Sequence, residues 1–231
     1  MPKIRLYLNK KISNEDKIEL SKDQIHYLKN VMRKKENDEI FIFNDEEEWL
    51  AEIEIIEKLI LIPKKFIRKK SNKFNIWIYF GLIKNRNLNF LIEKVTEIGV
   101  NKIIPIQTAF SENINIKYDR LKKIIIEATE QSDSLLLPKL EDCKTLKGVL
   151  NNWDKERLII FCDEKLRVDK PFKLNKSQKV AIFIGPVGGW SIKERELFEN
   201  INHNKISLGE NVLKVDTAAI VALAKIKGLL I

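Results

Sequence analysis

The sequence predicts a chain of two parts, a small β-rich region followed by a larger α/β region with a parallel sheet. Before about residue 70, short apolar strands dominate and one helical pattern interrupts them. After residue 74, strand-like and helix-like segments alternate, which is typical of a parallel sheet with helices on both faces. Two strand candidates, Leu158–Cys162 and Val180–Ile184, are continuous apolar runs, as expected for strands buried on both faces. We therefore expect one domain at residues 1–70 and a second at residues 74–231.

The N-terminal region contains four strand candidates and one helix candidate. The strands are expected at Arg5–Leu8, Glu39–Phe43, Trp49–Ile56 and in a run that ends near Ile62. The helix is expected from Ser21 or Asp23 to about Arg33. Its apolar residues recur at helical spacing and share one face: Ile25, Leu28, Val31 and Met32. Short strands with a single helix indicate a small barrel-like β domain.

A basic segment, Pro63–Lys73, follows these strands. It holds six basic residues and no acidic residue: Lys64, Lys65, Arg68, Lys69, Lys70 and Lys73. Two interpretations are open. The segment is either a solvated linker or a strip that contacts phosphate groups between the two domains.

In the C-terminal region, strands and helices follow one another in turn. The strands are expected at Ile76–Phe80, Lys102–Ile106, Leu158–Cys162, Val180–Ile184 and Lys205–Leu208. The helices are expected at Arg86–Ile98, Arg120–Gln131, Ser191–Asn200 and from about Asp216 to Lys227. Gly99 ends the first of these helices.

The composition excludes several classes of protein. With 231 residues, of which 44% are hydrophobic and 32% charged, the chain can form a sizeable core without disulfides. Its two cysteines form no CxxC motif, which excludes a disulfide scaffold and a cysteine-based zinc site. The N-terminus lacks the apolar stretch of a signal peptide, and no apolar run approaches the roughly 20 residues of a membrane span, so we expect a cytoplasmic protein. The net charge of +9 fits either a solvated lysine surface or a nucleic-acid-binding surface.

Two glycine-containing loops are the best candidates for a binding site. Gly185-Pro186-Val187-Gly188-Gly189 directly follows a buried strand, and Ser191 with Glu194 forms a capping-box pattern at the start of the next helix. Gly209 follows the last strand, and Asp216 or Thr217 can cap the final helix. Open α/β sheets bind ligands beyond the carboxyl ends of their strands. Each loop could therefore contact a ligand, although each also fits an ordinary strand–helix connection.

Common catalytic motifs are missing from the sequence. It contains no GxxxxGK[ST], no GxGxxG after a strand, no HExxH and no GxSxG. His26 and His203 are too few and too far apart for a histidine-rich metal site, so we expect no metal. What remains is a site built from backbone loops, which suits the positioning of a small organic cofactor.

Five motifs carry a family resemblance. IGPVGGWS at Ile184–Ser191 resembles the IGPEGG loop of the 16S rRNA uridine-N3 methyltransferases, the RsmE type of the SPOUT superfamily. LGENVLKVDTA at Leu208–Ala218 resembles their LGxxILRxETA signature. IEKVTEIGV, EATEQS and HYLKNVMR resemble three further family segments and stand at Ile92–Val100, Glu127–Ser132 and His26–Arg33. The five motifs occur in family order and span most of the chain.

The resemblance implies a fold and a cofactor. It implies an α/β SPOUT methyltransferase domain with a deep trefoil knot near the C-terminus, preceded by a PUA-like β-barrel domain that helps to hold RNA. It also implies a homodimer and S-adenosylmethionine bound between two knot loops. The implied cofactor-binding residues are Gly185, Pro186, Gly188, Gly189, Leu208, Gly209, Leu213, Thr217 and Ala218.

The implied reaction is methylation of N3 of a specific uridine in the 16S rRNA of the small ribosomal subunit. Uridine N3 must lose its proton before it can attack the methyl group, so a cation near O2 or O4 would favour the reactive anion. The catalytic candidates are Lys214 and Arg5, with Asp216 as orienter or proton acceptor. The expected RNA contacts are Arg5, His26, Arg33, Lys64, Lys65, Arg68, Lys69, Lys84 and Lys94.

The sequence departs from the family pattern at several positions. Val187 replaces a glutamate, Lys214 an arginine and Asp216 a glutamate, and Ser134 stands where the family usually has arginine. Lysine keeps the charge of arginine but loses its planar fork. Two alternative functions therefore stay open: a SPOUT methyltransferase with another RNA substrate, and a non-catalytic RNA-binding protein with a degenerate knot.

Overall fold

The computed structural model describes residues 4–14, 16–55, 58–71, 74–168, 172–175 and 177–230. The chain divides into two compact units. The first unit consists of Met1–Ser71 together with Thr129–Leu136, and the second consists of Asn72–Ala128 and Leu137–Ile231. The first unit is thus discontinuous in sequence, and Thr129–Leu136 had been expected in the C-terminal region.

The N-terminal unit is a five-stranded sheet with one short helical segment. Its elements are β1 (Arg5–Tyr7), β2 (Ile18–Glu19), α1 (Lys22–His26), the π-helical turn η1 (Tyr27–Val31), β3 (Glu39–Phe43), β4 (Glu47–Ile55) and β5 (Leu59–Lys69). The strand order is β1-β3-β4-β5-β2; β1 pairs with β3 in parallel, and the other pairs are antiparallel. Alternate residues such as Ile40, Ile42, Ala51 and Ile53 form its core.

The predicted N-terminal strands and helix are present, most of them with different bounds. The strand at Glu39–Phe43 has the predicted limits, and Ser21 caps α1 through a complete capping box with Gln24. The predicted helix is divided, because its second half adopts the π-helical turn and ends at Val31. Ile56, predicted as the end of a strand, lies outside the described residues.

Strand β5 corrects the interpretation of the basic segment as a linker. It continues through Pro63 to Lys69, because β4 offers a partner over this whole length: Leu50 pairs with Lys65 and Glu48 with Arg68. Two register shifts in the pairing let the strand pass Pro63, which has no amide hydrogen to donate. Lys73, at the end of the segment, lies outside the described residues.

The C-terminal unit has a parallel sheet, as predicted. Its strands are β6 (Asn75–Gly81), β7 (Lys102–Gln107), β8 (Lys139–Leu140), β9 (Lys144–Thr145), β10 (Leu158–Cys162), β11 (Lys179–Ile184) and β12 (His203–Ile206). Its helices are α2 (Asn85–Ile98), α3 (Tyr118–Gln131, whose last residues belong to the first unit), α4 (Leu146–Asn151), α5 (Ile192–Glu199) and α6 (Val215–Leu230). The strand order is β12-β10-β11-β6-β7-β8, and β9 also pairs with β7.

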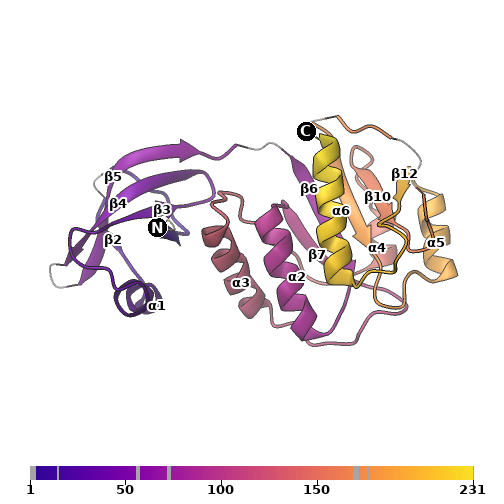
Figure 1. Cartoon of the computed structure of the whole chain (residues 1–231), viewed down its shortest axis with the longest axis horizontal. Helices are drawn as coiled ribbons and strands as arrows, with labels where there is room; N and C mark the ends of the chain where they lie inside the picture. The colour runs from indigo at the N-terminus through magenta and orange to yellow at the C-terminus, as the bar shows by residue number, and fades with distance from the viewer. Residues whose placement is uncertain are drawn as a thin grey trace. The chain divides into compact units, whose positions relative to one another are not determined.

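Apolar residues on both faces of this sheet are buried under helices. Ile78 and Phe80 of β6 face a cluster that includes α2 and α6, which lie side by side (Figure 1). Tyr79, between them, faces the opposite cluster with α4 and α5 and stacks on Phe183 at a centroid distance of 4.3 Å. The alternation along one strand therefore fixes which helices cover which face.

In the described residues, no helix is long and apolar enough to cross a membrane.

Candidate functional site

A cavity lies at the carboxyl ends of β10, β11 and β12, inside the C-terminal unit. Its lining consists of Cys162, Asp163, Glu164, Leu166, Ile184, Gly185, Pro186, Val187, Gly188, Gly189, Leu208, Gly209, Asn211, Val212, Leu213, Val215 and Ala218. All of the predicted cofactor-binding residues except Thr217 belong to this lining. Thr217 lies on the exposed side of the first turn of α6. The structure thus brings together two loops that are about 20 residues apart in the sequence.

The loop after β11 is held in one conformation by its neighbours. Gly189 has a positive φ of 72° and donates its amide to the carbonyl of Pro186 at 2.9 Å, which closes a tight turn. The indole of Trp190 is buried and donates to the carbonyl of Cys162 at 3.1 Å. A Cβ atom on Gly185 would lie 3.0 Å from that indole, so only glycine fits there without a shift. This loop forms a rigid wall of the cavity.

The start of α5 anchors the same loop. Ser191 and Glu194 form the predicted capping box, in which each side chain accepts a hydrogen bond from the other's backbone amide. The other oxygen of Glu194 accepts the amide of Ala109 at 2.7 Å. The loop after β7 is therefore tied to the loop after β11.

Gly81, at the end of β6, packs against a residue of this site, and the sequence did not predict this contact. A Cβ atom at this position would lie 2.7 Å from the backbone nitrogen of Pro186 and 2.8 Å from its ring. The only sequence signal was a glycine directly after the apolar run Ile76–Phe80. Its partner is known only once β6 and β11 are paired.

Two carboxylates on the loop after β10 were also missed. Asp163 and Glu164 line the cavity, and both accept hydrogen bonds from Arg195 of α5. The Arg195–Asp163 contact is 2.7 Å, and the Arg195 Nε also donates to the carbonyl of Trp190 at 3.3 Å. One guanidinium thus joins the two loops that form neighbouring walls. No local motif signals this contact, because the residues are about 30 positions apart.

The third wall is the segment between β12 and α6. The hydroxyl of Ser207 accepts the amide of Gly209 at 3.2 Å, and Lys225 donates to the carbonyl of Ser207 at 3.0 Å. Arg167, from the loop after β10, donates to the carbonyl of Glu210 at 2.7 Å. These contacts hold the segment over the cavity by its backbone.

Lys214 and Asp216 lie beside the cavity. Lys214 is exposed, and its carbonyl accepts the amide of Ala218 at 2.7 Å in the first turn of α6. Asn87 of α2 donates its side-chain amide to one oxygen of Asp216 at 3.3 Å, and the amide of Thr217 donates to the other at 3.0 Å. Asp216 therefore has a fixed side chain, whereas Lys214 extends into solvent.

Arg5 has a structural position in the N-terminal unit. It is 3% exposed, and its Nε donates to the buried carboxylate of Glu48 at 2.7 Å. Its other nitrogens donate to the carbonyls of Thr129, Glu130 and Ser134 at 2.9, 3.2 and 2.9 Å. This differs from the catalytic and RNA-contacting roles implied by the resemblance, because the donors of the guanidinium are occupied inside one unit. Arg5 fixes Thr129–Leu136 to the sheet.

The remaining predicted RNA contacts differ in how far their charges are already paired. His26, Arg33, Lys64, Lys65, Lys69 and Lys84 are exposed. Arg68 bonds to Glu48 at 2.6 Å and to Asp133 at 2.9 Å. Lys94 bonds to Glu93 and Glu97, each at 2.7 Å, and the hydrogen bond to Glu93 raises the pKa of the Lys94 ammonium. Lys64 pairs with Glu52 at 3.7 Å, so the exposed Lys65 and Lys69 of β5 are the better candidates for phosphate contacts.

Among the described residues, no group of three or more His, Cys, Asp or Glu side chains is arranged to hold a metal ion.

Comparisons with known proteins place the chain in a family. A family model described as an RNA methyltransferase domain matches residues 70–227, and one described as an RNA methyltransferase PUA domain matches residues 20–63. The N-terminal match covers α1, η1, β3, β4 and the start of β5.

Solved structures share this fold over nearly the whole chain. The ribosomal RNA small subunit methyltransferase E of Neisseria gonorrhoeae, solved with S-adenosyl methionine, superposes with a TM-score of 0.86 at 22% identity and covers 98% of both chains. A methyltransferase candidate from Legionella pneumophila, solved with the same cofactor, superposes with a TM-score of 0.84 at 24% identity over 99% of this chain and 98% of that one. At these identities the likeness establishes the shared fold.

Relatives with the same name are similar in sequence. The ribosomal RNA small subunit methyltransferase E of Rickettsia conorii is 34% identical over 96% of this chain and 94% of its own length. The protein of that name from Buchnera aphidicola (strain Sg) is 29% identical over 96% and 95% of the two chains. The chain therefore belongs to the family of ribosomal RNA small subunit methyltransferases E.

Proposed function

We propose that this protein is a 16S rRNA (uracil-N3)-methyltransferase that uses S-adenosylmethionine and modifies a specific uridine of the small ribosomal subunit. The observation that carries the proposal is the cavity at the carboxyl ends of β10, β11 and β12, which gathers two motif loops of the family around one space. Membership in the family supports methyl transfer to ribosomal RNA. The position N3 comes from the motif resemblance.

The residues of the cavity suit S-adenosylmethionine, which supplies a methyl group already activated on a sulfonium. Gly185, Pro186, Gly188 and Gly189 would hold it on one side, and Leu208, Gly209, Leu213 and Ala218 on the other, with Thr217 at the rim. The glycines let a ligand approach the backbone closely, and apolar side chains lie opposite them. This arrangement suits the flat base of a nucleoside. The carboxylates of Asp163 and Glu164 suit a positive charge on the ligand.

The proposed chemistry at the uracil needs only two side chains beside the cofactor. Lys214 would stabilise the negative charge that spreads onto uracil O2 and O4 when N3 loses its proton. Asp216, fixed by Asn87, would accept that proton or orient the base. The target N3 lies on the Watson–Crick edge, so the base must be unpaired when it enters. Arg5 is buried in the N-terminal unit and contacts no substrate in this scheme.

The fold details implied by the family are part of the proposal. The segment 207–214 would pass through the loop after β10 as a trefoil knot; the contacts of Arg167 with Glu210, and of the Ser207 hydroxyl with the carbonyl of Arg167 at 3.3 Å, support this threading. The N-terminal sheet would close as a PUA-like barrel that holds RNA through the exposed lysines of β5. The protein would act in the cytoplasm.

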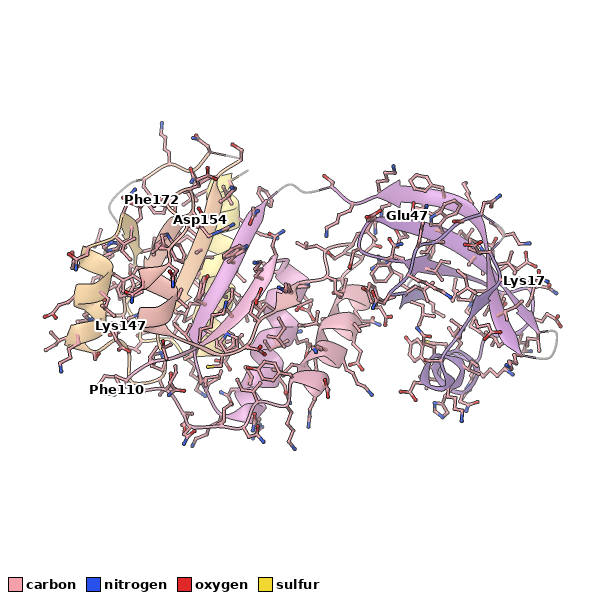
Figure 2. The ribbon with its side chains drawn as sticks, turned by 180° about the vertical axis from the view of Figure 1, so that it is seen from behind. Lys17, Glu47, Phe110, Lys147, Asp154 and Phe172 are labelled. Atoms are coloured by element: carbon pink, nitrogen blue, oxygen red, sulfur yellow. The ribbon has the colours of Figure 1, made fainter. Side chains whose placement is uncertain are left out.

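A homodimer would complete the site. Val187 and Val212 line the cavity and are 75% and 68% exposed, and Phe110, 53% exposed, lies at the periphery of the unit (Figure 2). The Cβ atom of Phe110 lies 2.8 Å from where a side chain on Gly188 would begin, so all three apolar residues are close to the cavity. Apolar side chains of this size are rarely left exposed together unless another surface covers them.

Primer extension on 16S rRNA tests the proposal. N3 methylation blocks Watson–Crick pairing, so reverse transcriptase should stop one nucleotide before the modified uridine only in cells that contain the protein. A stop on another RNA would indicate a different substrate. An unchanged profile on all RNAs, together with heat of binding for RNA but none for S-adenosylmethionine, would indicate a non-catalytic RNA-binding protein.

A pair of variants tests the location of the site. Gly188→Leu should abolish binding of S-adenosylmethionine in calorimetry, because even its Cβ atom would collide with Phe110. Gly228→Leu is the matched control, since a Cβ atom at that position has no neighbour within 4 Å. Full affinity in a folded Gly188→Leu protein would refute the placement of the cofactor.

A further inference from the structure

We propose that Asp163 and Glu164, fixed by Arg195, make the cavity selective for a cationic ligand, so that it binds the sulfonium donor more tightly than the uncharged thioether product. This inference rests on the proposed function. It concerns three residues outside the family motifs that carried the resemblance, and it assigns them a role in specificity.

The charge of the cavity wall is the first step. Among the described residues of the lining, Asp163 and Glu164 are the acidic ones, and none is Lys, Arg or His. Their side chains are 10% and 28% exposed, and the Arg195 side chain that bonds to both is 17% exposed. Two carboxylates and one guanidinium leave the wall with a net charge of about −1. The neighbouring Lys165 and Arg167 are not among the lining residues, and Arg167 bonds to the carbonyl of Glu210.

The position of Glu164 requires a glycine opposite it. A Cβ atom on Gly189 would overlap the Oε1 atom of Glu164, the same oxygen that bonds to Arg195 and accepts the amide of Trp190 at 3.4 Å. The carboxylate is therefore fixed by two donors and seated against a backbone that leaves space for it. The Glu164 side chain is therefore held in one conformation by its neighbours.

Arg195 occupies a position in α5 that is usually unfavourable for a positively charged side chain. It lies near the N-terminus of α5, where the helix dipole disfavours a cation. The bonds to Asp163 and Glu164 offset this cost, and the guanidinium neutralises one of the two negative charges. The arrangement holds two carboxylates side by side at the cavity, both bonded to the same guanidinium.

The reaction changes the charge of the ligand at this wall. When the N–CH₃ bond forms and the S–CH₃ bond breaks, the electron pair of the broken bond stays on sulfur, and the sulfonium becomes a neutral thioether. A unit charge several ångströms from a net charge of −1, at an effective dielectric constant of about 20, changes affinity by roughly tenfold or more. The wall would therefore favour entry of the donor and release of the product.

Calorimetry on the full chain tests this with three ligands: S-adenosylmethionine, S-adenosylhomocysteine and sinefungin, an analogue with an amine in place of the methylated sulfur. The natural protein should bind both cationic ligands about tenfold more tightly than S-adenosylhomocysteine. Glu164→Gln keeps an oxygen for Arg195 but removes the charge. It should weaken both cationic ligands about tenfold and change the affinity for S-adenosylhomocysteine less than twofold. Asp163→Asn is a second variant with the same expectation.

A control variant on α5 separates the effect of these two carboxylates from that of a carboxylate on the helix itself. Glu199→Gln removes an exposed carboxylate on α5 that pairs with Lys205, and it should leave the affinities for all three ligands unchanged. Equal weakening of all ligands by Glu164→Gln and Asp163→Asn, with folding intact by circular dichroism, would mean that the carboxylates only shape the loop, and would overturn the inference. Equal affinity of the natural protein for charged and uncharged ligands would also overturn it. If the folded natural protein binds none of the three ligands, the proposed cofactor itself is refuted.

Discussion

Gly81→Ala is a small substitution at a position where the structure leaves no room for it. The new Cβ atom would lie 2.7 Å from the nitrogen of Pro186 and 2.8 Å from its Cβ and Cδ atoms. A relaxed contact would need about 3.5–4 Å, so the end of β6 and the loop after β11 must separate by roughly 1 Å. The proline ring and the paired strands cannot rotate away as a flexible side chain would. Overpacking of this kind costs about 1–3 kcal/mol, which corresponds to a fall in Tm of roughly 2–12 °C for a chain of this size.

The same substitution at Gly228 provides the control. Gly228 lies in α6, and a Cβ atom there has no neighbour within 4 Å. Because alanine is the better helix former, Gly228→Ala should raise the stability by up to about 1 kcal/mol. Thermal unfolding would compare the two variants, and calorimetry would measure the affinity for S-adenosylmethionine. It should fall in Gly81→Ala, because Pro186 lines the cavity, and stay constant in Gly228→Ala. Equal Tm values for Gly81→Ala and the natural protein would refute the contact.

Three further predictions concern other parts of the molecule. Arg5→Ala should destabilise the N-terminal unit by about 3 kcal/mol, because the buried carboxylate of Glu48 keeps only Arg68 and the carbonyls of Thr129, Glu130 and Ser134 lose their donor. The Kd for S-adenosylmethionine should stay within twofold. Denaturant unfolding and calorimetry check the two parts, and an unchanged unfolding midpoint would contradict the structural role. Burial raises the pKa of Tyr79 to about 12, against a partial opposing effect of Arg157, so the folded state retains a proton that the unfolded chain releases near pH 10. The free energy of unfolding should therefore fall by up to about 1.4 kcal/mol per pH unit between pH 10 and 12. Denaturant titrations at several pH values should show a smaller fall for Tyr79→Phe. An identical pH dependence in the variant would show that Tyr79 is not responsible. The double variant Lys65→Gln, Lys69→Gln should weaken RNA binding, and the magnitude of the slope of log affinity against log salt should decrease by about 1.4. The control variant Lys147→Gln on α4 should change neither quantity. An unchanged slope in the double variant would mean that β5 does not contact the RNA.

The parts of the fold that could be predicted are those with local signals. The strand at Glu39–Phe43 follows from its own apolar residues, and the capping box at Ser191 follows from two residues three positions apart. The parallel sheet follows from the alternation of elements. The structure of the basic segment Pro63–Lys73 could not be predicted from local signals. Its lysines fit either a linker or a phosphate-contacting strip and give no strand signal, but β4 supplies the pairing partners that keep Pro63–Lys69 in a strand.

The residues of the candidate site also divide into those with a local sequence signal and those without one. The glycine loops could be recognised because glycine and proline restrict the backbone at their own positions. Gly81, Glu164 and Arg195 could not, because each depends on a partner distant in sequence: Pro186, Gly189 and Asp163 respectively. Arg5 was assigned a role at the substrate from the family resemblance, and only the carbonyls of Thr129–Ser134 reveal its structural function.

The discontinuity of the N-terminal unit has a consequence for synthesis on the ribosome. Residues up to Ser71 leave the ribosome first, but Arg5 and Glu48 cannot complete their buried network until Thr129–Leu136 has also been made. At ~5–20 residues per second, the roughly 65 intervening residues take about 3–13 s. During that interval the guanidinium of Arg5 would lack the carbonyls of Thr129, Glu130 and Ser134. The earliest part of the chain to emerge is therefore not the earliest to reach its final structure, and a fragment that ends at residue 71 should remain incompletely folded.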